Sequence, residues 1–321
     1  MVHTVELFLN LNSDELNYIV DKFNITSKSY YNFEKHHNVD GVNVEIKKLE
    51  TKIGNRWRLY VFVDIIKLLE RAEINTEDKC EIIEKINKIL YDIFSYIPEL
   101  ALYRIDYRFD VVINNNEKRK LLIKLYNKYE NKKAYMEKQK VYNKRTGRSH
   151  KNSSLRYKNK SKSCNIYDKE IERAAKCESV KEYEKNVLRF EAQVKRKHIQ
   201  YMKKHYNIDD SLEVYFSTEL YNVFMSKIVI STIGIADYFN KYHAKNIIAS
   251  SNLKQKEKDE LIEFLEVING NNTLQNGKEI YSSYKYRKFL EQLKKLNINP
   301  VLIPKNSGFS KIENPIKNIC L

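Results

Sequence analysis

The chain has 321 residues, with 58 lysines and arginines against 42 aspartates and glutamates, and therefore a formal net charge of +16. This surplus predicts a polyanionic partner, either nucleic acid or an anionic membrane surface. The 42% hydrophobic content excludes a wholly disordered chain, and the length allows about two domains.

Three features argue against membrane insertion and secretion. The most apolar stretch, Tyr221 to Phe239, is interrupted by two charged residues and is too short for the ~20 apolar residues of a membrane span. Glu6 lies inside the apolar run at the N-terminus, so no signal peptide is expected. The four cysteines form no CxxC pair, which favours a reduced, cytoplasmic protein without a cysteine-based zinc site.

The first hundred residues alternate strand and helix patterns. Thr4–Leu11 alternates as a strand, and Ser13 is the expected N-cap of a helix that ends near Phe23. Strands are predicted over 44–49 and 56–65, with a turn at Gly54-Asn55 between them. Isoleucines and a leucine at helical spacing predict a helix over 76–97, beginning at Thr76.

The next hundred residues carry the most charge. A strand is predicted over 101–113 and a basic helix over 117–129. Residues 138–163 contain ten lysines and arginines and no acid, which indicates an exposed loop or hairpin. Strands over 165–169 and 187–195 follow, and the second leads into a basic helix that ends near Tyr206.

After Asp210 the pattern is almost wholly helical, with breaks at 269–277 and 299–304. The sequence therefore predicts an α+β fold, in which an antiparallel-sheet domain over 1–210 precedes a smaller helical domain over 211–321.

One predicted strand places charges where a plain core strand would not. Arg104, Asp106, Arg108 and Asp110 share one face by period-two alternation. Two carboxylates ~7 Å apart along a strand could bind one divalent cation. The alternative is a solvated face whose charges neutralise each other.

Two later segments add further chemistry. Tyr167 has Lys169 two residues on, and a phenol of pKa ~10 needs a nearby cation or base to act as a nucleophile at neutral pH. Arg189 and Glu191 share the polar face of the last predicted strand. Each motif, taken alone, is more often structural. If the three segments are neighbours in one sheet, Asp106 and Glu191 could supply metal ligands near Tyr167 for phosphodiester chemistry.

The order of these motifs resembles a known family. RIDYRFD, a basic stretch, IYDKEIE and then LRFEAQVKRKHI are similar to the gene II/gene X replication initiators of filamentous phages and related plasmids. The opening TVELFLNL and the segment NRWRLYVFVDIIKLL, residues 55–69, are also similar to this family. The resemblance therefore covers about residues 1–210, with a weaker likeness over 290–304.

This resemblance implies an HUH-like fold and rolling-circle initiation. Such a protein nicks one strand of its origin, stays joined to the 5′ phosphate through tyrosine, releases a 3′-OH primer and later rejoins the strand. The resemblance implies Tyr167 as nucleophile, Lys169 as its electrostatic helper, and Arg104 and Arg189 as supporting charges. Asp106 and Glu191 become the expected metal ligands, with Asp110 as a further one, although the family need not have an acid there.

One departure from the wider superfamily bears on the metal. The chain has no His-hydrophobic-His pair, since His36 and His37 are adjacent and the other histidines are scattered. Carboxylates would then hold the metal, which favours Mg²⁺ or Mn²⁺ over zinc.

The expected partner is origin DNA, single-stranded or melted, in the cytoplasm of a bacterial host, with a host helicase as a further partner. Tyr142 and Tyr157 are available to stack on bases. The sequence does not identify a second tyrosine for rejoining, for which Tyr157 is one candidate. A basic helix after Asp210 could recognise duplex origin DNA or only pack on the sheet. The basic segment supplies the predicted DNA-binding residues, which are Lys144, Arg145, Arg148, Lys151, Arg156, Tyr157, Lys158, Lys160 and Lys162.

Two other interpretations remain open from the sequence. One is a non-catalytic DNA-binding regulator of replication or transcription, in which all three motifs are structural. The other is an RNA-binding protein that uses its basic, tyrosine-rich surface.

Overall fold

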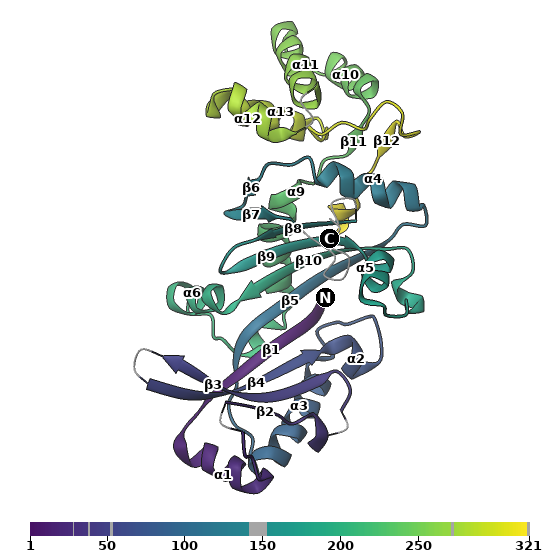
Figure 1. The fold of residues 1–321 in the computed structure, drawn as a ribbon. Helices are drawn as coiled ribbons and strands as arrows, with labels where there is room; N and C mark the ends of the chain where they lie inside the picture. The colour runs from purple at the N-terminus through teal and green to yellow at the C-terminus, as the bar shows by residue number, and fades with distance from the viewer. Residues whose placement is uncertain (28, 38, 52–53, 141–152, 271–272, 320–321) are drawn as a thin grey trace. The chain divides into compact units, whose positions relative to one another are not determined.

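A computed structural model describes residues 1–27, 29–37, 39–51, 54–140, 153–270 and 273–319 (Figure 1). It is a mixed α+β protein with a large antiparallel sheet, which confirms the predicted class. The chain forms two compact units. The first contains Met1–Arg108, Lys160–Lys162 and Ala192–Phe224, and the second contains Phe109–Asn159, Ser163–Glu191 and Met225–Leu321.

The first unit holds a sheet with the strand order β2-β3-β4-β1-β5. Its strands are β1 (Val2–Leu11), β2 (Tyr30–Asn32), β3 (Val42–Thr51), β4 (Gly54–Asp64) and the first part of β5 (Ala101–Val112). Its helices are α1 (Ser13–Phe23), η1 (Glu34–His36), α2 (Ile65–Leu69), α3 (Lys79–Phe94), α6 (Arg196–Tyr206), α7 (Leu212–Tyr215) and α8 (Thr218–Phe224).

Strict alternation gives this sheet one apolar face. In β4, Leu59, Val61 and Val63 are fully buried, and in the antiparallel register Leu7 of β1 lies opposite Val61. Helices α1 and α3 contact each other and bury one apolar stripe each, which includes Ile19 and the isoleucines of α3. These stripes complete the core of the first unit, because an amphipathic helix buries its apolar side against a sheet.

Three predicted element ends differ from the structure. Helix α1 is capped by Asn12, whose side-chain oxygen accepts from the Glu15 amide while the Glu15 carboxylate accepts from the Asn12 amide; Ser13 is the first helical residue. The predicted turn at Gly54-Asn55 is wrong, because Gly54 already pairs with Thr51 as the first residue of β4. Helix α3 begins at Lys79, with Asp78 as its N-cap.

The second unit holds strands in the order β10-β9-β8-β7-β6. These are β6 (Lys132–Lys133), β7 (Met136–Gln139), β8 (Ser154–Lys158), β9 (Lys162–Asp168) from Ser163 on, and β10 (Val187–Lys195) as far as Glu191. The unit also holds the second part of β5 and the helices α4 (Asn116–Tyr126), α5 (Lys169–Lys176) and η2 (Glu182–Glu184). Strands β7 and β8 pair antiparallel, so the described ends of the predicted basic loop form a hairpin. Residues 141–152 lie outside the described part of the chain.

The C-terminal part of the second unit is mostly helical, as predicted. Its elements are the π-helical segment η3 (Met225–Ile230), α9 (Ser231–Ile233), α10 (Lys241–Ala249), α11 (Gln255–Gly270), α12 (Leu274–Ile280), α13 (Ser283–Lys295), η4 (Pro315–Asn318), β11 (Tyr238–Phe239) and β12 (Lys311–Ile312). No helix among the described residues is long and apolar enough to cross a membrane.

The compact units do not follow the predicted division at residue 210. Residues after Met225 pack with 109–191 instead, through a buried polar cluster around Tyr129. The Tyr129 hydroxyl accepts a hydrogen bond from Asn299 at 2.6 Å, and the Tyr126 ring contacts the Tyr238 ring edge-on. A sequence division based on the change from strands to helices could not reveal these long-range contacts.

We expect Ile86→Ala to destabilise the first unit by about 2–5 kcal/mol, because Ile86 is buried in the α3 stripe and truncation leaves a cavity. Urea unfolding followed by the fluorescence of Trp57, the single tryptophan, reports this unit. The control is Tyr91→Ala on the exposed side of α3, for which a change within about 0.5 kcal/mol is expected. Equal effects of both variants would contradict the packing described.

Candidate active site

The turn from β9 into α5 positions the predicted nucleophile. Asp168 ends the strand and caps the helix, because its Oδ1 accepts from the amides of Glu170 and Ile171. Acidic residues in the first helical turn suit the positive end of the helix. Tyr167 is consequently the last strand residue before a rigid cap, and Lys169 is the first residue of the helix.

The structure brings Tyr167 and Glu191 together. The Tyr167 hydroxyl donates to Glu191 Oε1 at 2.5 Å, and Asn165 lies 3.5 Å from the second carboxylate oxygen. Burial raises the pKa of the Tyr167 phenol well above its usual 10.0, and the Glu191 carboxylate raises it further, against the lowering effect of Arg189. The phenol is therefore protonated at neutral pH, with a carboxylate already placed to accept its proton.

Lys169 lies beside this pair. Its Nζ is 5.9 Å from the centre of the Tyr167 ring, 2.8 Å from Glu172 and 3.5 Å from Glu184. Burial lowers the pKa of Lys169 below its usual 10.5, and the positive charge of Arg189 lowers it further, while Glu172 opposes the shift. The two glutamates hold this buried ammonium group next to the phenol.

Arg189 is fully buried and forms a two-point ion pair with Asp110. Its Nε and Nη2 donate to the two carboxylate oxygens at 2.7 and 2.8 Å. Burial disfavours its charge, but Asp110 and Glu191 hold the pKa of Arg189 above its usual range. Asp110 thus serves as the partner of Arg189, and this contact lends no support to the prediction that Asp110 binds metal.

The remaining predicted residues of the site, Arg104 and Asp106, belong to the first unit. Asp106 is buried on β5, with its Oδ1 3.3 Å from Arg104 Nε, and Arg104 also approaches Glu6 at 3.6 Å. Both charges on this strand face are thus close to a partner of opposite sign. That Asp106 joins Glu191 as a metal ligand stays a prediction.

The predicted metal fits the chemistry of the predicted ligands, but the described residues form no cluster of such ligands. Carboxylate oxygens suit Mg²⁺ or Mn²⁺. Within the ranges that the structure describes, no group of three or more histidine, cysteine, aspartate and glutamate side chains is gathered to hold a metal ion. Mg²⁺ or Mn²⁺ stays a prediction from the sequence.

The predicted DNA-binding residues fall into three groups. Lys144, Arg145, Arg148 and Lys151, together with Tyr142, lie outside the described residues. Lys158 and Lys160 are exposed, and Arg156 and Lys162 are half-buried, so these four side chains reach solvent beside β8 and β9.

The structure contradicts the predicted DNA-binding role of Tyr157. Its side chain is fully buried, and its hydroxyl donates to the backbone carbonyl of Glu130 at 2.5 Å. The alternation of β8 turns Leu155 and Tyr157 into the core. Because the ring lies in the core and the hydroxyl is bound to a backbone carbonyl, Tyr157 is not placed to attack a phosphate or to stack on a base. Burial also raises the pKa of its phenol.

Arg119 was not predicted as a site residue, because it lies in a segment whose sequence indicates only a basic helix. Arg119 is buried, and it donates to Asp168 at 2.8 Å, Glu170 at 2.6 Å and Asn186 at 2.7 Å. It therefore braces the cap that holds Tyr167. The buried Leu122 and Ile123, three and four residues further along the same helix, were the signal that this position faces the core.

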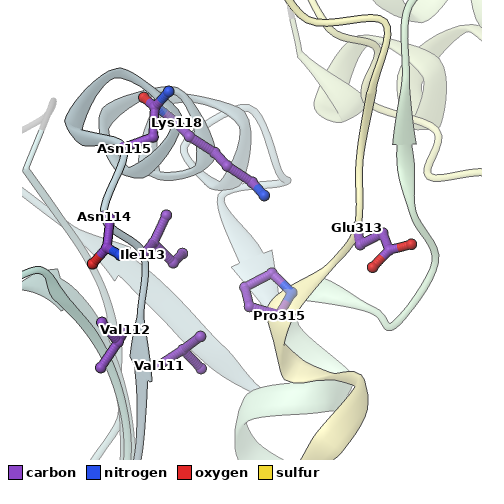
Figure 2. A pocket seen from close by; sticks show the side chains of 8 residues that line it. All are labelled: Val111, Val112, Ile113, Asn114, Asn115, Lys118, Glu313 and Pro315. Carbon is purple, nitrogen blue, oxygen red and sulfur yellow. The ribbon is translucent and has the colours of Figure 1, made fainter.

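A cavity of about 360 Å³ lies in the second unit, at the end of β5 and the start of α4 (Figure 2). Lys118 extends toward it, and Pro315 and Glu313 come from the C-terminal segment. Its lining is given by Val111, Val112, Ile113, Asn114, Asn115, Lys118, Glu313 and Pro315. Tyr167 and Glu191 are not part of this lining.

No protein-family model matches the chain, and no curated protein is similar enough to count as a relative. The functional interpretation accordingly depends on the residues themselves, above all on the contact between Tyr167 and Glu191.

Glu184→Gln should destabilise the second unit at pH 7 by about 3 kcal/mol, because it leaves Arg173 and the buried Lys169 with a missing counter-charge. Burial alone would raise the pKa of Glu184, but hydrogen bonds from Arg173 and the Lys181 amide lower it from 4.5 to about 2. The carboxylate's contribution is therefore full above pH 4.5 and lost as the pH falls toward 2. Urea unfolding followed by circular dichroism at pH 7 and pH 3 measures this.

The expected signature is a difference between wild type and variant that shrinks at pH 3. A difference that is the same at both pH values would show that the Glu184 carboxylate is not the stabilising group. Glu182→Gln is the matched control, because Glu182 is exposed.

Proposed function

We propose that the protein is a rolling-circle DNA replication initiator, which nicks and rejoins one strand at a replication origin through a covalent 5′-phosphotyrosine. The observation that carries this proposal is the hydrogen bond from the Tyr167 hydroxyl to Glu191, 2.5 Å long, with Lys169 beside the ring. A phenol that must attack a phosphodiester needs a base for its proton and positive charge for the phosphate. The order of the sequence motifs supports the same activity.

The chemical step balances without an outside oxidant or reductant. The Tyr167 oxygen attacks the scissile phosphorus and forms the new P–O bond, while the bond from phosphorus to the 3′ oxygen breaks. Glu191 takes the phenol proton, and the departing 3′ oxygen gains a proton, so the products are a 3′-OH and a phosphotyrosine. The reverse of this step rejoins a strand, because the phosphotyrosine bond keeps the energy of the phosphodiester.

Lys169 and Arg189 supply the fixed positive charge near the phenol. Both are held by acidic partners, so they cost little reorganisation when negative charge develops on the phosphate. A divalent cation, when bound, would add Lewis-acid stabilisation of the same charge, with Glu191 as the predicted ligand in this unit.

The proposal also explains the polyanion partner. Lys158 and Lys160 are exposed close in sequence to the strand that carries Tyr167, where backbone phosphates of single-stranded or melted origin DNA would meet them. Extension from the released 3′-OH requires strand separation, which makes a host helicase the expected partner in the bacterial cytoplasm.

Tyr167→Phe should abolish the covalent protein–DNA adduct, because the variant keeps the ring and loses the attacking oxygen. The assay incubates the protein with labelled supercoiled DNA of the replicon that encodes it, in Mg²⁺ or Mn²⁺, and detects label that stays with the protein on a denaturing gel. The matched control is Tyr96→Phe, a tyrosine that also donates to a glutamate but lies in the first unit.

Loss of the adduct in Tyr167→Phe alone supports the assignment. An adduct that persists in Tyr167→Phe would assign the nucleophile elsewhere. Wild type that binds the DNA and gives no nick with either metal would favour the non-catalytic regulator.

Glu191→Gln should lower the nicking rate by about 10²–10⁴-fold, since general-base catalysis typically contributes that much. The amide keeps the size of the side chain and accepts a hydrogen bond, yet it cannot take the proton. Single-turnover nicking measures the rate, and anisotropy with the same DNA checks that binding changes less than about threefold. A variant that loses binding and nicking in equal measure would make Glu191 a structural residue.

A further inference from the structure

The face of the first unit's sheet opposite its apolar core carries aromatic and basic side chains in alternation. In β4, Arg58, Tyr60 and Phe62 point away from the buried Leu59 and Val61. This face is not a plain solvated surface, because large rings occupy positions where an antiparallel sheet normally shows small or polar groups to water.

The strand register arranges these residues in rows across the sheet. One row consists of Tyr30 on β2, Lys47 on β3, Arg58 on β4 and Asn10 on β1. The next row on the same face lies two residues further along each strand and includes Tyr60. In that second row Phe8 lies opposite Tyr60. Side chains directly opposite each other on one face have Cβ atoms about 4.5–5.5 Å apart, so rings and cations form a continuous surface.

The distances between cations and rings agree with this interleaving. Lys47 Nζ lies 5.6 Å from the ring centres of both Tyr30 and Tyr60. The Arg58 guanidinium lies 4.6 Å from the Phe8 ring and 5.8 Å from the Tyr60 ring. The Arg104 guanidinium lies 5.7 Å from the Phe62 ring. Cations above rings hold both groups in place, which leaves less freedom to be lost when a ligand binds.

Two of the rings are open to solvent. Tyr30 is 42% exposed and Phe62 is 37% exposed, while Tyr60 is half-buried between them in the sheet. Arg58 makes its hydrogen bonds to neutral groups, the Asn10 side chain at 2.9 Å and the Tyr60 hydroxyl at 3.4 Å, so these contacts leave its charge uncompensated. Lys47 is ion-paired with Glu45, which lies opposite Tyr60 on the same face. The surface therefore combines exposed ring faces with the positive charge of Arg58.

We propose that this aromatic ladder, which consists of Tyr30, Lys47, Arg58, Tyr60 and Phe62, binds single-stranded DNA. Bases stack on the rings, Lys47 helps to hold the rings of Tyr30 and Tyr60, and Arg58 contacts a phosphate, the combination that proteins use for single strands without reading sequence. Tyr60 and Phe62 are two residues apart on one strand, about 7 Å, which suits successive bases of an extended chain. The identity of the polymer as DNA rests on the proposed function.

The same sheet face continues to the predicted site residues of the first unit. Glu6 pairs with Phe62 on one side and with Arg104 on the other, and Thr4 pairs with Asp106. A strand bound on the aromatic ladder would consequently run toward Asp106. This continuity connects a binding surface to a residue that the sequence analysis singled out for chemistry.

The test measures binding separately from nicking. Fluorescence anisotropy is recorded with labelled oligothymidylate of about 20 nucleotides, in EDTA, on full-length protein carrying Tyr167→Phe, so that no strand is cut. Phe62→Ala and Tyr30→Ala each remove an exposed ring and should weaken binding about tenfold, since stacking on one aromatic side chain is worth that much. Arg58→Ala should weaken binding and reduce the salt dependence by about one phosphate contact.

The matched control is Tyr91→Ala, an exposed tyrosine on α3, with an expected change below twofold. Trp57 fluorescence confirms that each variant is folded. A change below twofold for the Phe62→Ala/Tyr30→Ala double variant would overturn the proposal. Tighter binding of oligouridylate, or of duplex DNA, would also overturn it.

Failure here is distinct from failure of the proposed function. Weaker oligothymidylate binding in the ring variants supports the aromatic ladder even if wild type forms no covalent adduct. A covalent adduct with no effect of the ring variants overturns the aromatic ladder and leaves the nucleophile in place.

Discussion

The buried guanidinium of Arg189 is the constraint on which the arrangement of the second unit's site depends. A fully buried charge is stable only with a well-aligned partner, and Asp110 supplies it with two hydrogen bonds from the neighbouring part of β5. Fixing Arg189 fixes the polar face of β10, and with it the position of Glu191 two residues on. The contact of Glu191 with Tyr167 then follows from the pairing of strands rather than from any loop, and such a fixed geometry is what the proposed in-line attack would require.

The sequence predicted this part well because strand alternation is strong where one face is buried. The predicted strand over 187–195 has the same bounds as β10, and the strand predicted over 101–113 differs from β5 by one residue. The sequence predicted only that Tyr167 and Glu191 would be near each other if their strands were neighbours. The alternation of side chains predicts which face of a strand a residue occupies, but it does not predict which strand lies alongside.

The failures have local physical reasons. Tyr157 was treated as part of a basic segment, whereas its alternation with Leu155 places it in the core. Arg119 was counted as one charge of a basic helix, whereas its long side chain donates to four acceptors, Asp168, Glu170, Asn186 and the Ile113 carbonyl. The division at residue 210 followed the change of secondary structure, but Tyr129 and Asn299, 170 residues apart, hold both sides of it in one unit. Composition cannot reveal such contacts, because a buried lysine or arginine contributes to the net charge as much as a solvated one.

The lysines and arginines behind the net charge of +16 are of two kinds, buried and paired or exposed. Lys169, Arg189 and Arg119 are buried and bound to carboxylates, so they contribute little long-range attraction and serve to position groups at the site. Arg58 on the first unit's sheet is hydrogen-bonded to neutral groups, and Lys158 and Lys160 are exposed. Only charges of this second kind attract a polyanion at a distance, because paired charges cancel beyond a Debye length. A polyanion would therefore be attracted by exposed charges of this second kind, whereas the proposed chemistry at Tyr167 depends on charges that are already bound to carboxylates.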